Sequence, residues 1–312
     1  MMFKNSFKLL MTNFSTVWKL LFYKLIILAF VFGLFCITLP TFNSLTNVQE
    51  LEESISSFLT SYNFNSSFSN MLLSLFAIVQ IILNILGEML IFAPWTLIYL
   101  ILLTFILLPT LWRFSDIAVG ETLYGFMASQ TKYGFVASLI KKLKVSVSYS
   151  LLYSIITLPY NLLILAGAYG LLCLVNIGGL LLYALPFILF VFLLLTISIK
   201  TTILSGFMPA IVTFNCNEFT GLRKGVKAVS RRFYRTWSTS IIICAITMAL
   251  LSFFGVFSAI LIVPIFSFWI LIFQMVMFFG SQGMRFYVDS ETIVTPKKLE
   301  ETDSVRKLKL VI

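Results

Sequence analysis

Long apolar runs separated by short polar segments organise the chain. The runs are continuous rather than alternating at period two, which favours transmembrane helices over the strands of a barrel. Allowing about 20 residues for each crossing, we expect an all-α, polytopic membrane helix bundle with about six transmembrane helices. The expected spans are about 18–39, 89–111, 147–174, 180–204, 239–259 and 262–280.

Three further segments are expected to lie along the membrane surface as helices rather than cross it: about 3–17, 69–86 and 218–237. In the first of them, apolar side chains recur at helical spacing among lysines. Lys19 and Lys24, at the start of the first span, are expected to extend toward the surface as long amphipathic side chains do. Residues 1–284 thus form a single membrane domain, and 285–312 a basic cytoplasmic tail.

The apolar block from Met71 to Trp112 is long enough for two crossings, but the charges around it favour one. Residues 40–70 contain glutamates and no Lys or Arg, as expected outside, whereas 113–146 are basic, as expected inside. We therefore predict one crossing, with residues 69–86 as an outer helix that is interfacial or re-entrant and breaks at Gly87-Glu88. Part of a longer helix is the open alternative.

The distribution of charge predicts the orientation. A bundle of six spans with both termini inside places every basic cluster on one side, which agrees with the positive-inside rule. A net charge of +10 is then a topology signal and does not indicate a nucleic-acid partner. We expect a multi-pass protein of a cell membrane, in a bilayer that contains anionic lipids.

The most basic segment, Leu222 to Trp237, is amphipathic. At about 100° per residue, Leu222, Val226, Val229, Phe233 and Trp237 share one face. The cations fall on the other side: Arg223, Lys224, Lys227, Arg231, Arg232 and Arg235. Such a helix is expected to lie apolar side down in the interface, with its cations toward lipid headgroups or an acidic protein partner.

Composition excludes most enzyme classes. Hydrophobic residues make up 60% of the chain and charged residues 11%, with a mean hydropathy of +1.02 and no histidine. The four cysteines share no metal-ligand spacing, and phosphate-loop, zinc-protease and nucleophile-elbow motifs are absent. We expect no catalytic residues, no cofactor and no metal site, and hence not an enzyme.

Two charged residues lie within or beside apolar runs, Glu88 and Lys200. An ionisable group inside a membrane is a candidate for ion or proton transfer. The simpler interpretation favours a hydrated Glu88 at the outer end of the second span and a Lys200 that extends to the inner surface.

The order of motifs from about 100 to 285 resembles a loose group of bacterial six-helix membrane proteins without assigned function. A span is followed by Gly120-Glu121 and two spans, then by Met208-Pro209, Gly221, Lys224-Gly225, Ala228, Ser230 and Phe233. That group is similar to the membrane domain fused to some glycerophosphodiester phosphodiesterases. The resemblance implies a membrane-embedded role and carries no catalytic residues.

The expected function is that of a non-enzymatic scaffold, accessory or regulatory factor that acts through its basic cytoplasmic face. The alternative is a transporter or permease subunit, with a pathway along the spans kinked by Pro159 and Pro186. A membrane enzyme that acts on lipid phosphate is a third class, without a candidate base or nucleophile.

Overall fold

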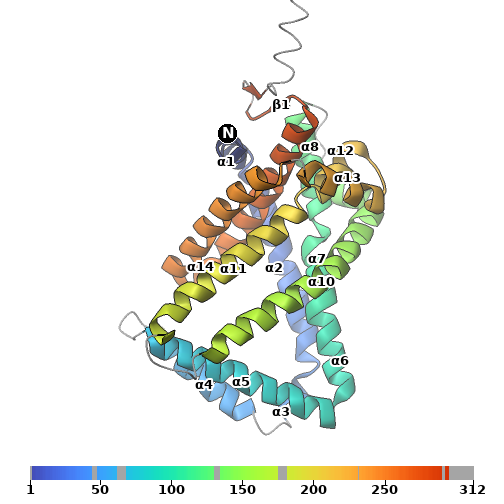
Figure 1. Ribbon diagram of the computed structural model, residues 1–312. Helices are drawn as coiled ribbons and strands as arrows, with labels where there is room; N and C mark the ends of the chain where they lie inside the picture. Colours follow the sequence, from blue (N-terminus) through green and yellow to red (C-terminus); the bar gives the residue numbers. More distant parts are fainter. Residues whose placement is uncertain are drawn as a thin grey trace, which may run out of the picture. The chain divides into compact units, whose positions relative to one another are not determined.

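The computed structural model describes residues 2–43, 48–61, 68–129, 134–174, 181–230, 232–289 and 292–294. Its regular structure is helical except for one two-stranded sheet, so the expected all-α bundle is confirmed (Figure 1). Within these ranges, seven helical segments are long and apolar enough to cross a membrane. The chain is a multi-pass membrane protein. Residues 175–180 between the third and fourth expected spans, Arg231 and the tail beyond residue 294 lie outside the described residues.

The chain divides into two compact units. Unit 1 comprises Met1–Ile26, Thr110–Tyr153 and Ile197–Ile312, and unit 2 comprises Ile27–Pro109 and Ser154–Thr196. Among the described residues, four helices continue from one unit into the other: α2 (Ser15–Cys36), α7 (Leu108–Phe114), α10 (Leu143–Cys173) and α11 (Leu181–Ile203).

Unit 1 begins with α1 (Met2–Thr12), which is packed against the protein. The indole N–H of Trp269 donates to the Ser6 hydroxyl at 3.2 Å, and Phe3 lies 5.5 Å from the Trp269 ring centre. The expected segment 3–17 is therefore two pieces, because the chain turns at residues 13 and 14 before α2 begins at Ser15.

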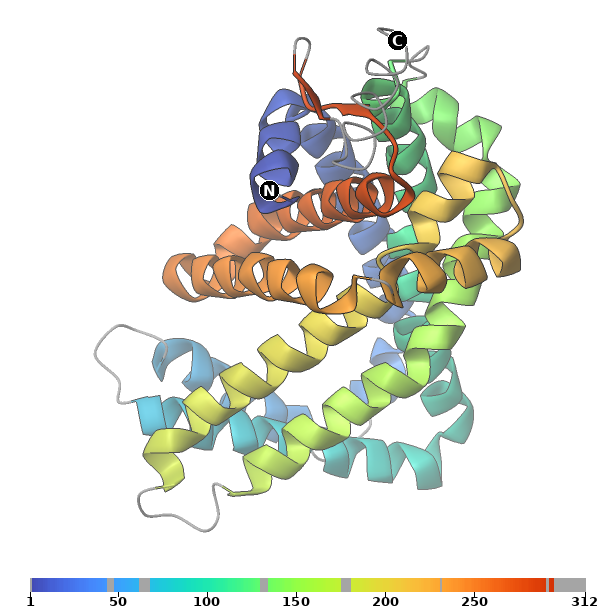
Figure 2. The ribbon, with the colours of Figure 1, turned by 45° about the horizontal axis from the view of Figure 1, so that its top comes forward.

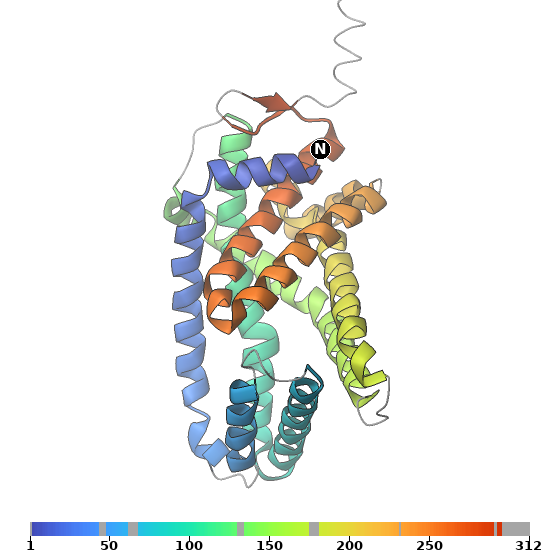
Figure 3. The same cartoon turned by 90° about the vertical axis from the view of Figure 1, so that its left-hand side faces the viewer.

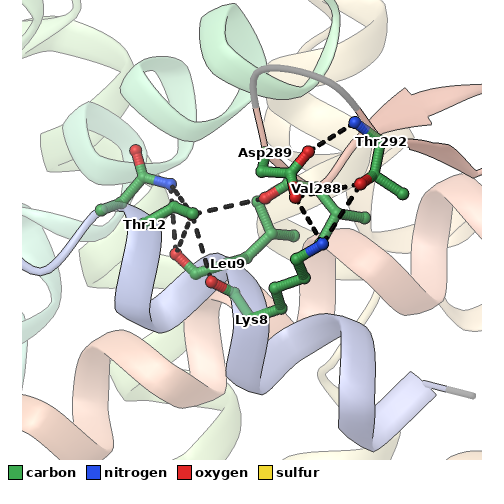
Figure 4. A network of polar contacts seen from close by, with 7 residues as sticks. Lys8, Leu9, Thr12, Val288, Asp289 and Thr292 are labelled. Atoms are coloured by element: carbon green, nitrogen blue, oxygen red, sulfur yellow. Dashed lines mark hydrogen bonds and ion pairs between the residues drawn. The ribbon is translucent and has the colours of Figure 1, made fainter.

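The start of the expected basic tail forms a hairpin that holds α1. Strands β1 (Phe286–Tyr287) and β2 (Ile293–Val294) pair antiparallel. Figure 4 shows the junction: the Lys8 ammonium pairs with Asp289 and donates to the Thr292 hydroxyl at 3.2 Å, while Thr12 donates to the Val288 carbonyl. These contacts tie α1, which carries the exposed lysines Lys4 and Lys8, to the hairpin.

The helix α14 (Phe233–Gln282) folds back on itself. A straight helix of 50 residues would be about 75 Å long, yet Met277 packs against Val229, just before the helix begins. Figures 2 and 3 show its two arms in orange, side by side. Both arms, Phe233–Leu251 and Ile260–Gln282, are candidate spans, which agrees with the two short spans expected at 239–259 and 262–280.

The polar segment expected between the second and third spans is helical. It contains α8 (Asp116–Met127) and α9 (Phe135–Lys141), followed directly by α10. α8 is mostly buried, so the expected cytoplasmic loop is an integral part of unit 1.

Unit 2 contains α3 (Leu39–Asn43), α4 (Val48–Ser61), α5 (Phe68–Phe92) and α6 (Pro94–Leu102). The break expected at Gly87-Glu88 is wrong: α5 continues through both residues and ends before Pro94. Ala93 takes a non-helical conformation (φ −144°, ψ 57°), because the residue before a proline avoids the helical region. The second expected span therefore starts at Pro94 rather than at residue 89.

From Pro94 the helix continues through a π-helical turn, Leu103–Leu107, into α7 (Leu108–Phe114). The wide turn directly precedes Pro109, which has no N–H to donate to the helix. In Figure 1, α5 runs crosswise to α6. Buried side chains of the two helices pack together: Ile85, Met89, Leu97 and Leu100.

Candidate functional site

The basic segment is built on a pair of short helices in unit 1. α12 (Phe207–Phe214) is buried over most of its length and ends at Asn215, whose left-handed conformation (φ 46°) allows an abrupt turn. α13 (Glu218–Ser230) then returns along it, and both helices are drawn in ochre in Figure 1.

Two glycines allow α12 and α13 to approach closely. A Cβ atom on Gly225 would lie 2.5 Å from the backbone carbon of Gly206, and one on Gly206 would lie 2.4 Å from the Gly225 carbonyl oxygen. Both contacts are with backbone, which cannot move aside as a side chain can. The position of α13 is therefore fixed by its small residues, with Gly221 and Ala228 also buried.

The expected single helix 218–237 is wrong. The chain turns at Arg232 (φ −136°, ψ 27°), and α14 begins at Phe233. The face of α13 that includes Gly221, Gly225 and Ala228 packs on α12, so the helix must end before the chain can enter α14. After the turn, Trp237 donates its indole N–H to the Ser198 hydroxyl at 3.1 Å.

The apolar face expected to enter lipid is only partly available to it. Val229 is buried against Met2 and Met277, whereas Val226 is exposed and Leu222 half-buried. Protein packing therefore contributes to holding α13 in place.

The expected cations separate into three groups. Arg223, Lys224 and Lys227 are exposed on α13 and Arg235 on α14, and none of these four pairs with a carboxylate of the described residues. Arg232 is half-buried in the turn, and Arg231 lies outside the described residues. Lys224 also lies over the Phe214 ring, with 4.5 Å from its Nζ to the ring centre. The exposed cations form a basic surface, defined here as Arg223, Lys224, Lys227 and Arg235.

A polar cavity of about 210 Å³ lies beside this pair of helices. Lys142 bridges two of its walls, through the Glu121 carboxylate at 3.2 Å and the Asn215 amide oxygen at 2.7 Å. Glu121 and Glu218 both line this cavity. The bridge joins α8 to the turn between α12 and α13, the helix that carries three of the four cations of the basic surface.

A second polar site in unit 1 is a buried cluster of charges. Lys24 of α2 is 2% exposed. Its ammonium donates to the Ser267 hydroxyl at 2.9 Å and lies 4.0 Å from the centre of the Trp112 ring. The expectation that Lys24 extends to the surface is therefore wrong. A hydroxyl and an aromatic face take the place of water around it.

The other charges of this cluster are Arg113 and Asp116. They form an ion pair of 3.1 Å in which Asp116 is 2% exposed and Arg113 27% exposed. The Arg113 guanidinium also lies 4.7 Å from the centre of the Tyr153 ring, and Tyr149 beside it is buried. Lys200 is half-buried in α11. We call Lys24, Arg113 and Asp116 the buried charge cluster.

Glu88 is not at the outer end of the second span, where it was expected. It lies half-buried on α5 in unit 2, because α5 extends to Phe92 and the next helix starts at Pro94.

The sequence contained signals for the buried charge cluster that the expected topology obscured. Arg113 and Asp116 are three residues apart, which places them on one helix face. Ser146, Tyr149 and Tyr153 likewise share one face of α10, and all three are buried. Both segments were assigned to a loop or a span boundary, where polar residues need no partner.

A comparison of the chain with models of known protein families, with curated proteins and with solved structures finds no match. The resemblance to six-helix bacterial membrane proteins stays a prediction.

Proposed function

We propose that this protein is a non-enzymatic membrane scaffold or accessory factor that binds through the basic surface. The observation that supports this most directly is the Gly206–Gly225 contact, which holds α13 close to α12 while its cations are exposed and have no carboxylate partner among the described residues. Rigid presentation lowers the entropy lost on binding. The binding partners that fit are anionic lipid headgroups and an acidic face of another protein.

The test is charge reversal in the intact protein. Arg223→Glu, Lys224→Glu and Lys227→Glu together should weaken binding to anionic lipid by roughly 100-fold at low salt, since each cation contributes about 1 kcal/mol. Native mass spectrometry of the protein, released from nanodiscs of phosphatidylglycerol or phosphatidylcholine, would measure retained lipid. Crosslinking in native membranes would measure the protein partner.

The matched control reverses three exposed lysines elsewhere in unit 1: Lys4, Lys19 and Lys144. It makes the same change in net charge without touching α13. Loss of anionic lipid or of the crosslinked partner in the α13 variant alone supports the proposal. An equal response of both variants would contradict it, because net charge alone would then explain the binding.

The proposal requires that the basic surface is cytoplasmic, and we infer six crossings in which α5 does not cross. Single cysteines replacing Lys4 and Lys142, in a background without the four native cysteines, should then be labelled from the same side. A seventh crossing by α5 would put them on opposite sides. A cysteine at Ser56 should react with an impermeant maleimide added to intact cells, whereas one at Lys142 should react only after permeabilisation.

A second candidate function is a transporter or permease subunit, and the buried charge cluster favours it. Charges inside a membrane domain are costly to keep and commonly belong to ion or substrate pathways. Uptake of a labelled anion into proteoliposomes, abolished by Lys24→Met and unaffected by the α13 reversal, would favour this candidate over the scaffold.

A further inference from the structure

Positive charge exceeds negative charge in the buried charge cluster. Of its two cations, Arg113 pairs with the one carboxylate, Asp116, at 3.1 Å, and Lys24 lies over the ring of Trp112, the residue before Arg113. Removing a cation from water is costly unless an opposite charge compensates it. Asp116 compensates one of them, so a further negative charge would stabilise the cluster.

The cations also have hydrogen-bond donors to spare. An ammonium has three N–H donors and a guanidinium five. Among the described residues, Lys24 donates one hydrogen bond, to Ser267, and Arg113 pairs with Asp116 alone. The remaining contacts of both are with aromatic faces, Trp112 and Tyr153, which attract cations but accept no strong hydrogen bond.

Two serine hydroxyls, close in sequence to Asp116 and to Tyr149, also have unused hydrogen-bonding capacity. The Ser115 hydroxyl precedes Asp116, and the Ser146 hydroxyl lies one helical turn before Tyr149 on the same face of α10. Both are fully buried without a partner among the described protein atoms. Buried hydroxyls normally form a hydrogen bond, so these two indicate a further acceptor or donor in this region.

We propose that the buried charge cluster binds a phosphate group, with Lys24 and Arg113 as its ligands. A phosphate oxygen accepts from an ammonium and, in a forked geometry, from a guanidinium. The phosphate would reach the site past Arg113, which is partly exposed. Lys24 is buried, about 14 Å along α2 from the start of that helix at Ser15. The phosphate belongs to a lipid headgroup or is free inorganic phosphate. The site is independent of the basic surface, since it shares no residue with α13.

The first experiment measures thermal unfolding of the intact, delipidated protein in a neutral detergent. Potassium phosphate replaces potassium chloride at constant ionic strength. The midpoint of unfolding should rise by about 3 °C for each tenfold increase in phosphate above its dissociation constant. Lys24→Met and Arg113→Gln should each remove that rise. Lys19→Met removes an exposed lysine from the same helix and should keep it.

Lys24→Met is informative even where stability changes. Because the cation it removes is uncompensated, the variant should unfold at the same temperature as the wild type, or higher, in phosphate-free buffer. Native mass spectrometry then separates the two sources. A phospholipid retained by the wild type and lost from Lys24→Met identifies a lipid headgroup, whereas a phosphate-dependent rise without retained lipid identifies the free anion.

Two results would overturn the site. The first is a wild-type protein that retains no phospholipid and whose unfolding midpoint does not rise with phosphate. The second is a wild-type response in both Lys24→Met and Arg113→Gln, since the anion would then bind elsewhere.

Discussion

Gly225→Ala is expected to lower the free energy of unfolding by about 3 kcal/mol, and with it the midpoint of thermal unfolding by about 6 °C. The added methyl group would meet three backbone atoms of Gly206 and Phe207 at 2.5–2.8 Å. Real Cβ atoms do not approach backbone so closely, so α13 must move away from α12. That movement exposes the buried residues Ala228 and Val229.

The control for this prediction is another helical glycine, Gly33 of α2, around which no atom lies within 4 Å of an added Cβ. Gly33→Ala should leave unfolding unchanged or raise its free energy by up to about 1 kcal/mol, because alanine is the better helix former. Thermal unfolding in detergent measures both. Equal midpoints for the two variants would show that the Gly206–Gly225 contact does not determine stability.

If α13 is displaced, the basic surface changes as well. Gly225→Ala should therefore weaken binding to anionic lipid even though every cation remains. This result would link the packing of α13 to the proposed function, and it distinguishes a rigid surface from a collection of charges.

The sequence predicted the class and most long helices because those depend on local apolar runs. The segments expected at 147–174 and 180–204 are helical within a few residues of those bounds, as α10 and α11. The break before Pro94 was also visible in the sequence. It was missed because Gly87-Glu88 looked more polar, although proline constrains the backbone more strongly than a glycine followed by one charge.

The candidate sites were harder to predict because they depend on contacts between distant segments. Amphipathicity placed Val226 on a lipid-facing side. The packing of α13 is instead decided by glycines, whose hydropathy is close to zero and therefore gives no signal of a helix contact. Lys24 looked like a surface lysine from its position on α2. Its partner Ser267 lies 243 positions further along the chain, and only the folded chain brings the two together.

The buried charge cluster leads to the second large effect. Asp116→Leu is expected to lower the free energy of unfolding by about 3 kcal/mol. It leaves the Arg113 guanidinium without its carboxylate and Lys24 without its nearby negative charge. Breaking a fully buried pair costs about 3–5 kcal/mol, and we expect the lower end of that range because Arg113 is 27% exposed.

Removing both partners should cost much less than removing one. In Asp116→Leu with Arg113→Met, the apolar side chains fill the space of the pair and no charge of the pair is left buried, so stability should return to within about 1 kcal/mol of the wild type. Adding Lys24→Met should raise it further, because that ammonium then has no carboxylate nearby. A thermal-unfolding cycle over the wild type, both single variants and the double variant measures the coupling between Arg113 and Asp116. If the losses in the free energy of unfolding of the two single variants add up in the double variant, the ion pair contributes nothing to stability. The charges of the cluster would then not interact strongly, and its excess of positive charge would no longer be a reason for it to bind a phosphate.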